Sequence, residues 1–195
     1  MPGSRNNSKN CNHACVDFTN LNLLAKKIKT KNNLIMILGN TLANEISMDK
    51  YLRRLRNISH KETHLLIGIE LVNNASKSTI NAVISEYNCE ENKGLTINPI
   101  NDIRSLSKAG ELIIIFNEEL SRIEERFVFN KHTIINNKNK NLKYNVGDYL
   151  LLSITQKPSL RAFVELIDRS GWSIQKYINI DNQYLFLLKK LEKKK

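Results

Sequence analysis

The sequence contains no long apolar segment. No apolar run approaches the roughly 18–20 residues that a membrane-spanning helix needs. Residues 1–20 also lack the apolar centre of a signal peptide. These two absences predict a cytoplasmic protein without a membrane partner.

Cysteine is also scarce. The three cysteines, Cys11, Cys15 and Cys89, form an odd and sparse set. Cys11, His13 and Cys15 offer three possible ligands, and nothing nearby supplies the fourth that a structural zinc site needs. We therefore expect no metal cofactor.

Acidic residues are fewer than basic ones. The chain has 19 Asp and Glu against 30 Lys and Arg, a net charge of +11. Such a charge can bind nucleic acid by neutralising phosphates. The lysines are scattered, however, with one cluster in the terminal LKKLEKKK, and Asn, Ile and Lys are abundant together, as coding bias would produce. We therefore interpret residues 191–195 as a solvated basic tail and do not expect a nucleic-acid partner.

The remaining composition is that of a folded protein. With 195 residues and 41% apolar content, the chain is long enough for one domain with a core, or for one domain that carries an insertion. Residues 1–14 have almost no apolar content, and we expect them to be disordered.

The first half of the chain shows the pattern of a parallel α/β unit. Apolar residues recur at helical intervals over 21–28, and LIMIL (34–38) and HLLIGIELV (64–72) are short apolar runs typical of buried strands. Between them, Ser47 is placed to cap a helix whose apolar residues recur on one face. Strand, helix and strand with short links predict a right-handed crossover.

The middle of the chain follows another pattern. A helix is expected around residues 80–87 and a loop over 88–101. Three strand-like runs follow: ELIIIF (111–116), RFVFNKHTII (126–135) and LKYNVGDYLLLSI (142–154). Consecutive strands after a βαβ unit indicate an inserted or appended antiparallel element.

The end of the chain returns to the first pattern. Residues 160–167 are spaced as an amphipathic helix that ends at Ser170 and Gly171, where glycine can adopt the left-handed cap. WSIQKYINI and QYLFLLKK then form two strands joined by a hairpin turn at Asp181 and Asn182.

Five segments, in this order, resemble the later half of a known enzyme family. They are LIMILGNTLAN, LLIGIELVNN, FNEELSRIEERFV, VGDYLLLSITQK and LIDRSGWSIQKYINIDNQYLFLL. The family is that of the ergothioneine-pathway histidine Nα-methyltransferases, and the fungal amine methyltransferases of ergot pathways look similar. The resemblance runs from about residue 15 to 190. It implies a partial class I methyltransferase sheet, Rossmann-like, from 15–72 and 158–190, with an inserted α+β substrate lobe at 73–157.

The resemblance also implies a cofactor, S-adenosylmethionine, and residues that contact it. Asp17 and Phe18 match the family's pair that holds the adenine. Gly39 begins the turn after the first predicted strand. In open α/β sheets ligands lie beyond the carboxyl ends of the strands, where a small turn lets the backbone approach them.

Four further residues match positions that contact the family's substrate. Asn44 would hydrogen-bond the amino or carboxylate group of an amino acid, although Asn40 and Asn44 could also simply cap a helix. Tyr87 falls near the family's carboxylate-binding tyrosine, or ends a helix face. Ser153 and Thr155 stand where the histidine enzymes carry a carboxylate and a serine around the imidazole, and Lys157 matches the lysine that follows.

Two departures from the family limit what the resemblance implies. A serine at 153 removes a charged acceptor, and losing a charged hydrogen bond typically costs about 1.5–3 kcal/mol. Histidine is therefore a doubtful substrate. The glycine-rich turn that cradles the methionine end of the cofactor is also missing, since none of the seven glycines forms such a loop.

These observations predict an N-methyltransferase of an amino acid or small amine. The chain would be a truncated or split form, with an upstream N-terminal fragment as its partner. The alternative is a non-catalytic binding protein descended from that family.

Overall fold

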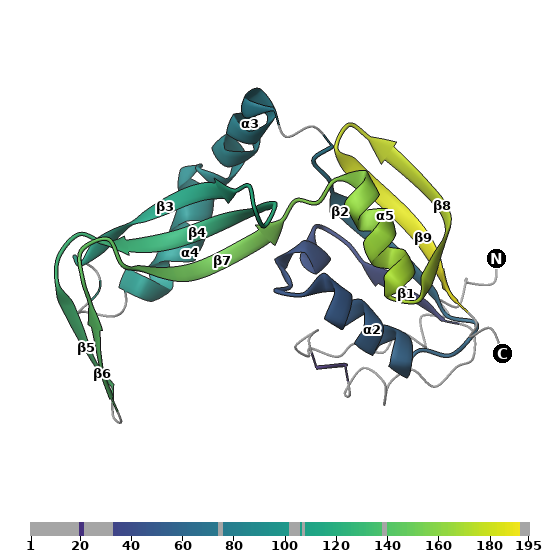
Figure 1. The fold of residues 1–195 in the computed structure, drawn as a ribbon, viewed down its shortest axis with the longest axis horizontal. Coiled ribbons are helices and arrows are strands. Elements are labelled where there is room, and N and C mark those ends of the chain that lie inside the picture. The colour runs from purple at the N-terminus through teal and green to yellow at the C-terminus, as the bar shows by residue number, and fades with distance from the viewer. Residues whose placement is uncertain are drawn as a thin grey trace, which may run out of the picture.

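The structure is a computed structural model that describes residues 20–21, 33–73, 76–101, 106, 108–137 and 140–191 (Figure 1). The predicted disorder of residues 1–14, the pair Asp17 and Phe18, and nearly all of the helix predicted over 21–28 lie outside the described residues. No helix in the described part of the chain is long and apolar enough to cross a membrane.

One sheet, here sheet A, joins the two ends of the described chain. Its strands run in the order β1 (Leu34–Ile37), β2 (His64–Glu70), β9 (Gln183–Lys190) and β8 (Trp172–Ile180). β1 and β2 are parallel, whereas β9 runs antiparallel to both β2 and β8. The hairpin between β8 and β9 turns at Asp181, which has a positive φ of 52°, as predicted from the sequence.

Two helices cover one face of sheet A. α2 (Met48–Ile58) begins after Ser47, whose hydroxyl accepts from the Lys50 N–H, and α5 (Leu160–Arg169) begins after Ser159 in the same way. Both helices place apolar residues against the odd-numbered residues of β2 and the even-numbered residues of β9. This layer is the main core.

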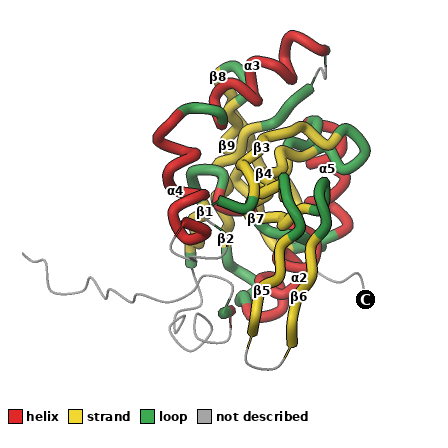
Figure 2. The backbone as a smooth tube through the Cα atoms, turned by 90° about the vertical axis from the view of Figure 1, so that its left-hand side faces the viewer, coloured by secondary structure: helices red, strands yellow, loops and turns green. Residues whose placement is uncertain are grey.

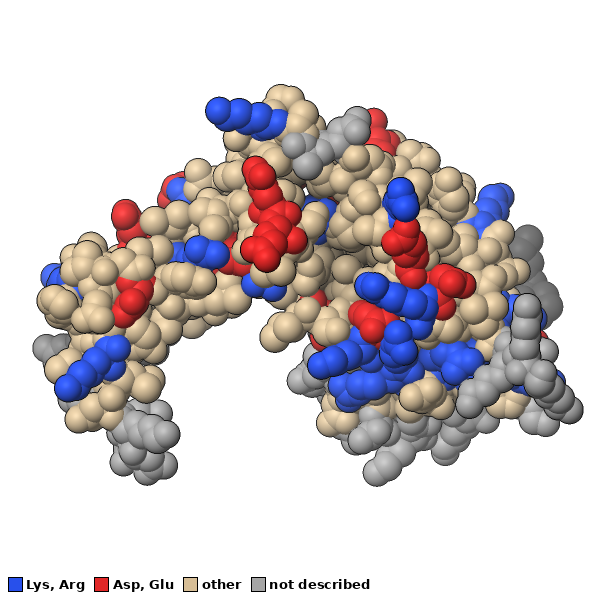
Figure 3. Space-filling model, in the orientation of Figure 1, with Lys and Arg blue, Asp and Glu red and all other residues tan. Residues whose placement is uncertain are grey.

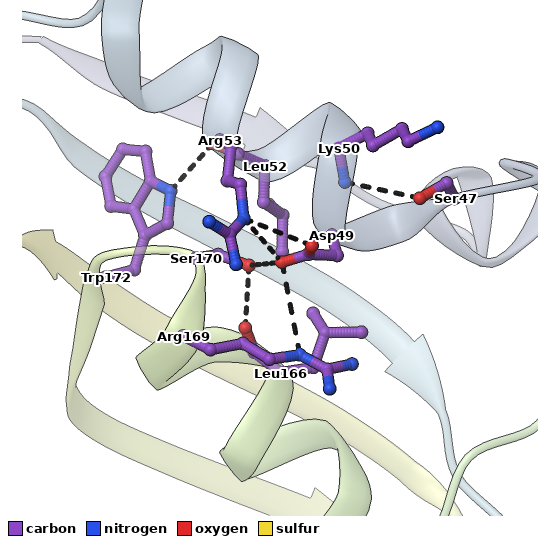
Figure 4. A network of polar contacts seen from close by, with 9 residues as sticks. All are labelled: Ser47, Asp49, Lys50, Leu52, Arg53, Leu166, Arg169, Ser170 and Trp172. Atoms are coloured by element: carbon purple, nitrogen blue, oxygen red, sulfur yellow. Dashed lines mark hydrogen bonds and ion pairs between the residues drawn. The ribbon is translucent and has the colours of Figure 1, made fainter.

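Polar contacts join α2 to the end of α5 (Figure 4). The Asp49 carboxylate accepts from Arg53 Nε at 3.0 Å and from the Ser170 hydroxyl at 3.0 Å. In addition, the indole N–H of the fully buried Trp172 donates to the Leu52 carbonyl oxygen at 3.1 Å. The two helices are therefore fixed both by apolar packing and by directional bonds.

The residues between β2 and α5 form an inserted lobe. It contains helices α3 (Lys77–Tyr87) and α4 (Glu90–Asn101) and a second sheet, sheet B. Sheet B has the order β3 (Gly110–Asn117), β4 (Arg122–Phe129) and β7 (Tyr149–Gln156), all antiparallel. A separate ribbon, β5 (Thr133–Asn137) with β6 (Lys140–Tyr144), projects away from the rest (Figures 1 and 2).

Three sequence predictions in this lobe are wrong. The loop expected over 88–101 is largely helix α4. Gly94 and Pro99 argue locally against a helix, but Ile97 and Ile100 pack against the apolar side of sheet B, and this tertiary packing overrides local propensity.

The other two errors are strands predicted too long. The run 126–135 breaks at residues 130–132, between β4 and β5, and the run 142–154 breaks at 145–148, between β6 and β7. At the second break, Gly147 has a φ of 89° and the Asp148 carboxylate accepts from the Asn145 N–H at 2.7 Å. Both breaks let the β5–β6 ribbon leave sheet B.

Candidate functional site

A cavity of about 510 Å³ lies where the carboxyl ends of β1 and β2 meet the inserted lobe. Its walls come from both sheets and from α3 and α4. Five of the seven residues that the sequence assigned to a site line it: Gly39, Asn44, Tyr87, Ser153 and Thr155. The roles of these residues remain predictions.

The turn after β1 is shaped by two residues with positive φ, Gly39 at 69° and Asn40 at 61°. A side chain at Gly39 would meet no atom within 4 Å, so the backbone there is open to a ligand. Asn40 does not cap the following short helix η1 (Thr41–Asn44) with its side chain. Its Oδ1 accepts from the Glu70 N–H at 2.6 Å and its Nδ2 donates to the Glu70 carboxylate at 3.4 Å, which ties the ends of β1 and β2 together.

Asn44 reaches across to the inserted lobe. Its Oδ1 accepts from the Thr155 hydroxyl at 3.0 Å. The helix-capping interpretation of Asn40 and Asn44 is therefore wrong, since both side chains bond to other elements. The bond joins two residues that the resemblance implies for the substrate site, although 111 positions separate them in sequence.

A buried ion pair forms the floor of the site. The Lys157 ammonium, fully buried, donates to the Glu70 carboxylate and lies 5.1 Å from the centroid of the Tyr87 ring. A cation over an aromatic face is attracted by the ring quadrupole. Lys157 thus joins the end of β2 to α3, and it fixes the Tyr87 ring beside the cavity.

Glu125 lines the same cavity and was missed by the sequence analysis. Its side chain accepts a hydrogen bond from the Thr96 hydroxyl of α4. A signal was available: Glu125 stands between Ile123 and Phe127 in the alternation of β4, at a position where an apolar residue is expected.

The distribution of charged side chains differs between the two parts of the molecule (Figure 3). Lysine and arginine side chains gather on the visible face of the part built on sheet A, over α2, while the part built on sheet B shows both signs scattered (Figure 3). The helix α2 contains Lys50, Arg53, Arg54 and Arg56. A nucleic-acid partner remains unexpected, because a charged outer helix face is common on solvated surfaces.

The described residues provide only part of a binding site for S-adenosylmethionine. The open backbone at Gly39 and the polar cavity beyond it suit the approach of a ligand to the strand ends. Asp17 and Phe18, which the resemblance assigns to the adenine, lie outside the described residues. The described residues contain no glycine-rich strand-to-helix turn for the methionine end.

The family match decides the assignment of the chain. Residues 5–190 match the family described as "Histidine-specific methyltransferase, SAM-dependent". The chain belongs to this family. The resemblance predicted from the sequence is thereby confirmed, and the structure has the mixed α/β class that was predicted.

Three of the solved structures that are similar to this chain are named as methyltransferases, and their sequence identity to it is low. An S-adenosylmethionine-dependent methyltransferase from Clostridium acetobutylicum has 9% identity and a TM-score of 0.42, over 92% of this chain and 64% of that chain. The CcbJ methyltransferase from Streptomyces caelestis has 8% identity and a TM-score of 0.41, over 91% and 62%. The sugar N-methyltransferase KedS8 from Streptoalloteichus has 10% identity and a TM-score of 0.38, over 91% and 61%. The chain thus spans less than two thirds of their length, and no curated protein matches it significantly.

Proposed function

We propose that this chain provides the substrate site of an S-adenosylmethionine-dependent N-methyltransferase that acts on an amino acid or small amine. One observation carries the proposal. Gly39, Asn44, Tyr87, Ser153 and Thr155, which come from three separate segments of the chain, line one polar cavity at the carboxyl ends of β1 and β2.

This cavity would contribute to catalysis by positioning the reactants. Transfer of a methyl group to an amine needs no covalent intermediate with the protein, so alignment of the two reactants supplies much of the catalysis. The Asn44 amide and the Tyr87 hydroxyl are suited to hold the amino and carboxylate groups of an amino acid. Bound S-adenosylmethionine would supply the methyl group.

Position 153 does not favour histidine as the substrate. Ser153 and Thr155 place hydroxyl groups in the cavity, and the Thr155 hydroxyl already donates to Asn44. A hydroxyl gives a neutral hydrogen bond, which is weaker than the bond an imidazole N–H makes to a carboxylate. The family's name alone therefore does not set the methyl acceptor.

The cofactor site requires a part that the described residues do not contain. We propose that an upstream fragment carrying a glycine-rich turn completes the sheet beside β1, which pairs with β2 on one side only among the described strands. The alternative, a binding protein that no longer catalyses, is favoured by the same lack of a glycine-rich turn among the described residues.

Calorimetry with S-adenosylmethionine, followed by methyl-transfer assays on a panel of amino acids, tests this proposal. We expect the chain alone not to methylate histidine, and activity on another amine to appear when the upstream fragment is added. Asn44→Ala should then weaken substrate use more than cofactor binding, because its side chain faces the substrate cavity. Micromolar cofactor binding with histidine turnover by the chain alone would contradict the proposal. No cofactor binding with the fragment present would support the non-catalytic alternative.

A further inference from the structure

Three glutamates are buried in the described part of the chain, and they differ in how their charge is balanced. Glu70, Glu124 and Glu125 have exposed fractions of 7%, 1% and 6%. Glu70 is paired with the Lys157 ammonium. Glu124 accepts from Arg122 and Arg126, each at 2.7 Å, and from Asn117 at 3.0 Å. Glu125 has no cationic partner among the described residues.

The surroundings of Glu125 make its charge costly. The residues two positions away on the same face of β4, Ile123 and Phe127, are each 1% exposed and belong to apolar clusters. The hydroxyl of Thr96 donates to one oxygen of the carboxylate, Oε2. A buried carboxylate is stable when it is paired with a cation and fully hydrogen-bonded, and one neutral hydroxyl supplies neither condition in full.

The position of Glu125 places its carboxylate within reach of a ligand in the cavity. Glu125 lines the cavity, and its direct partner across the antiparallel strands β4 and β7 is Ser153, which lines it too. Side chains directly opposite each other have Cβ atoms about 4.5–5.5 Å apart. A ligand group that contacts Ser153 is therefore within reach of the carboxylate.

The strand pairing changes next to this site. Glu125 pairs with Ser153, whereas Arg126 pairs with Leu151, so Leu152 is an extra residue in β7. Such bulges redirect side chains and are common beside binding sites. The pairing places Ser153 and Thr155 on the same wall as Glu125.

We propose that Glu125 is the anionic anchor for the substrate, and that the substrate is an amino acid or amine carrying a second, positively charged nitrogen besides the one that is methylated. This inference rests on the proposed function, because it names the substrate class of the same cavity. The ligand cation takes the place that Lys157 has beside Glu70 and that the two arginines have beside Glu124. The substrate thus completes a charge pair that the protein leaves open.

The test is calorimetric binding to the full chain without cofactor. The probes are L-ornithine, L-lysine and L-arginine, with L-norleucine as the uncharged control. We expect at least one cationic probe to bind about tenfold or more tightly than norleucine, and Glu125→Gln to remove about tenfold to a hundredfold of that affinity. Glu111→Gln is the control, because Glu111 is an exposed glutamate of sheet B that is not among the residues lining the cavity, and it should change the affinity by less than about threefold.

A second measurement separates a binding role from a structural one. If Glu125 carries an unbalanced charge, Glu125→Gln should raise the melting temperature of the free chain. A fall in melting temperature together with unchanged preference for cations would overturn the inference, as would equal binding of cationic probes and norleucine. This binding test measures no methyl transfer. If the cationic probes bind preferentially but the chain with its upstream fragment transfers no methyl group, the proposed function is contradicted and the role of Glu125 as an anchor is not.

Discussion

Lys157 is one of the residues that join the two parts of the molecule at the site. Its ammonium pairs with Glu70 at the end of β2 and lies over the Tyr87 ring of α3. Its backbone N–H donates to the Ser121 carbonyl oxygen at 2.8 Å, and its carbonyl oxygen accepts from the Ser121 hydroxyl at 2.8 Å. A buried pair is strongly destabilising to break, because the remaining charge is left without a partner.

Lys157→Met is expected to lower the free energy of unfolding by about 3–5 kcal/mol, because Glu70 would then be buried without its cation. The double variant Lys157→Met with Glu70→Gln should recover most of that loss. Urea unfolding followed by fluorescence of Trp172, the single tryptophan, measures both. A single variant as stable as the parent chain would show that the pair does not hold the two parts together.

At the scale of residues, the sequence predicted which residues would lie together better than it predicted their bonds, and the roles of those residues stay predictions. The resemblance supplied Asn44, Tyr87, Ser153 and Thr155, which the fold brings to one cavity. It could not show the bond between Asn44 and Thr155, because that contact depends on how the inserted lobe lies against sheet A. Glu125 lies inside one of the matched segments but was not among the site positions that the resemblance supplied. It pairs directly with Ser153, which stands where the histidine enzymes carry a carboxylate.

At the scale of elements, those with a local chemical signal were predicted correctly. Ser47 caps α2, and Gly171 has the left-handed φ of 79° that a helix end requires after α5. Helix α4 was missed because Gly94 and Pro99 lie inside it, and its stability comes from contacts with sheet B that no local pattern reveals. Glu90 and Glu91 in its first turn were the one favourable local sign.

Gly171 allows a test of how α5 is held to α2. The Gly171 carbonyl oxygen accepts from Arg56 Nε at 2.9 Å, and a Cβ on Gly171 would come within 2.6 Å of Arg56 Cδ. Gly171→Ala should lower the free energy of unfolding by about 2–4 kcal/mol, through the left-handed backbone and the displaced arginine.

Gly147→Ala is the matched control for this element. Gly147 also has a positive φ, 89°, but a Cβ there would meet nothing within 4 Å. Gly147→Ala should lower the free energy of unfolding only through the left-handed backbone conformation, by about 1–2 kcal/mol. Equal losses for the two variants in urea unfolding would mean that the contact with Arg56 contributes nothing.

At the scale of the whole molecule, the described helices cover only one face of sheet A, and the other is called the open face here. α2 and α5 both lie on the same side (Figure 1). On the other side, Leu66, Ile178, Leu185 and Leu187 line an apolar groove that no helix among the described residues covers. Parallel strands are normally buried on both faces. The continuous apolar runs at 34–38 and 64–72 predicted two buried strands, but this is wrong for β1. Leu34 and Met36 are 56% and 58% exposed, because no helix among the described residues covers their face of the sheet.

Met36 provides the final prediction, because it lies on the open face in β1, at the edge of the described sheet. Its side chain is 58% exposed, and it pairs in register with Leu66 of the groove. An exposed apolar edge strand is a template for association with other chains, and a lysine on such an edge opposes it. Met36→Lys should therefore reduce concentration-dependent light scattering of the isolated chain while leaving its melting temperature unchanged. Ile46→Lys is the control, since Ile46 is 82% exposed but precedes α2, away from this face. Equal effects of the two lysines would mean that general charge, and not the open face of sheet A, governs association.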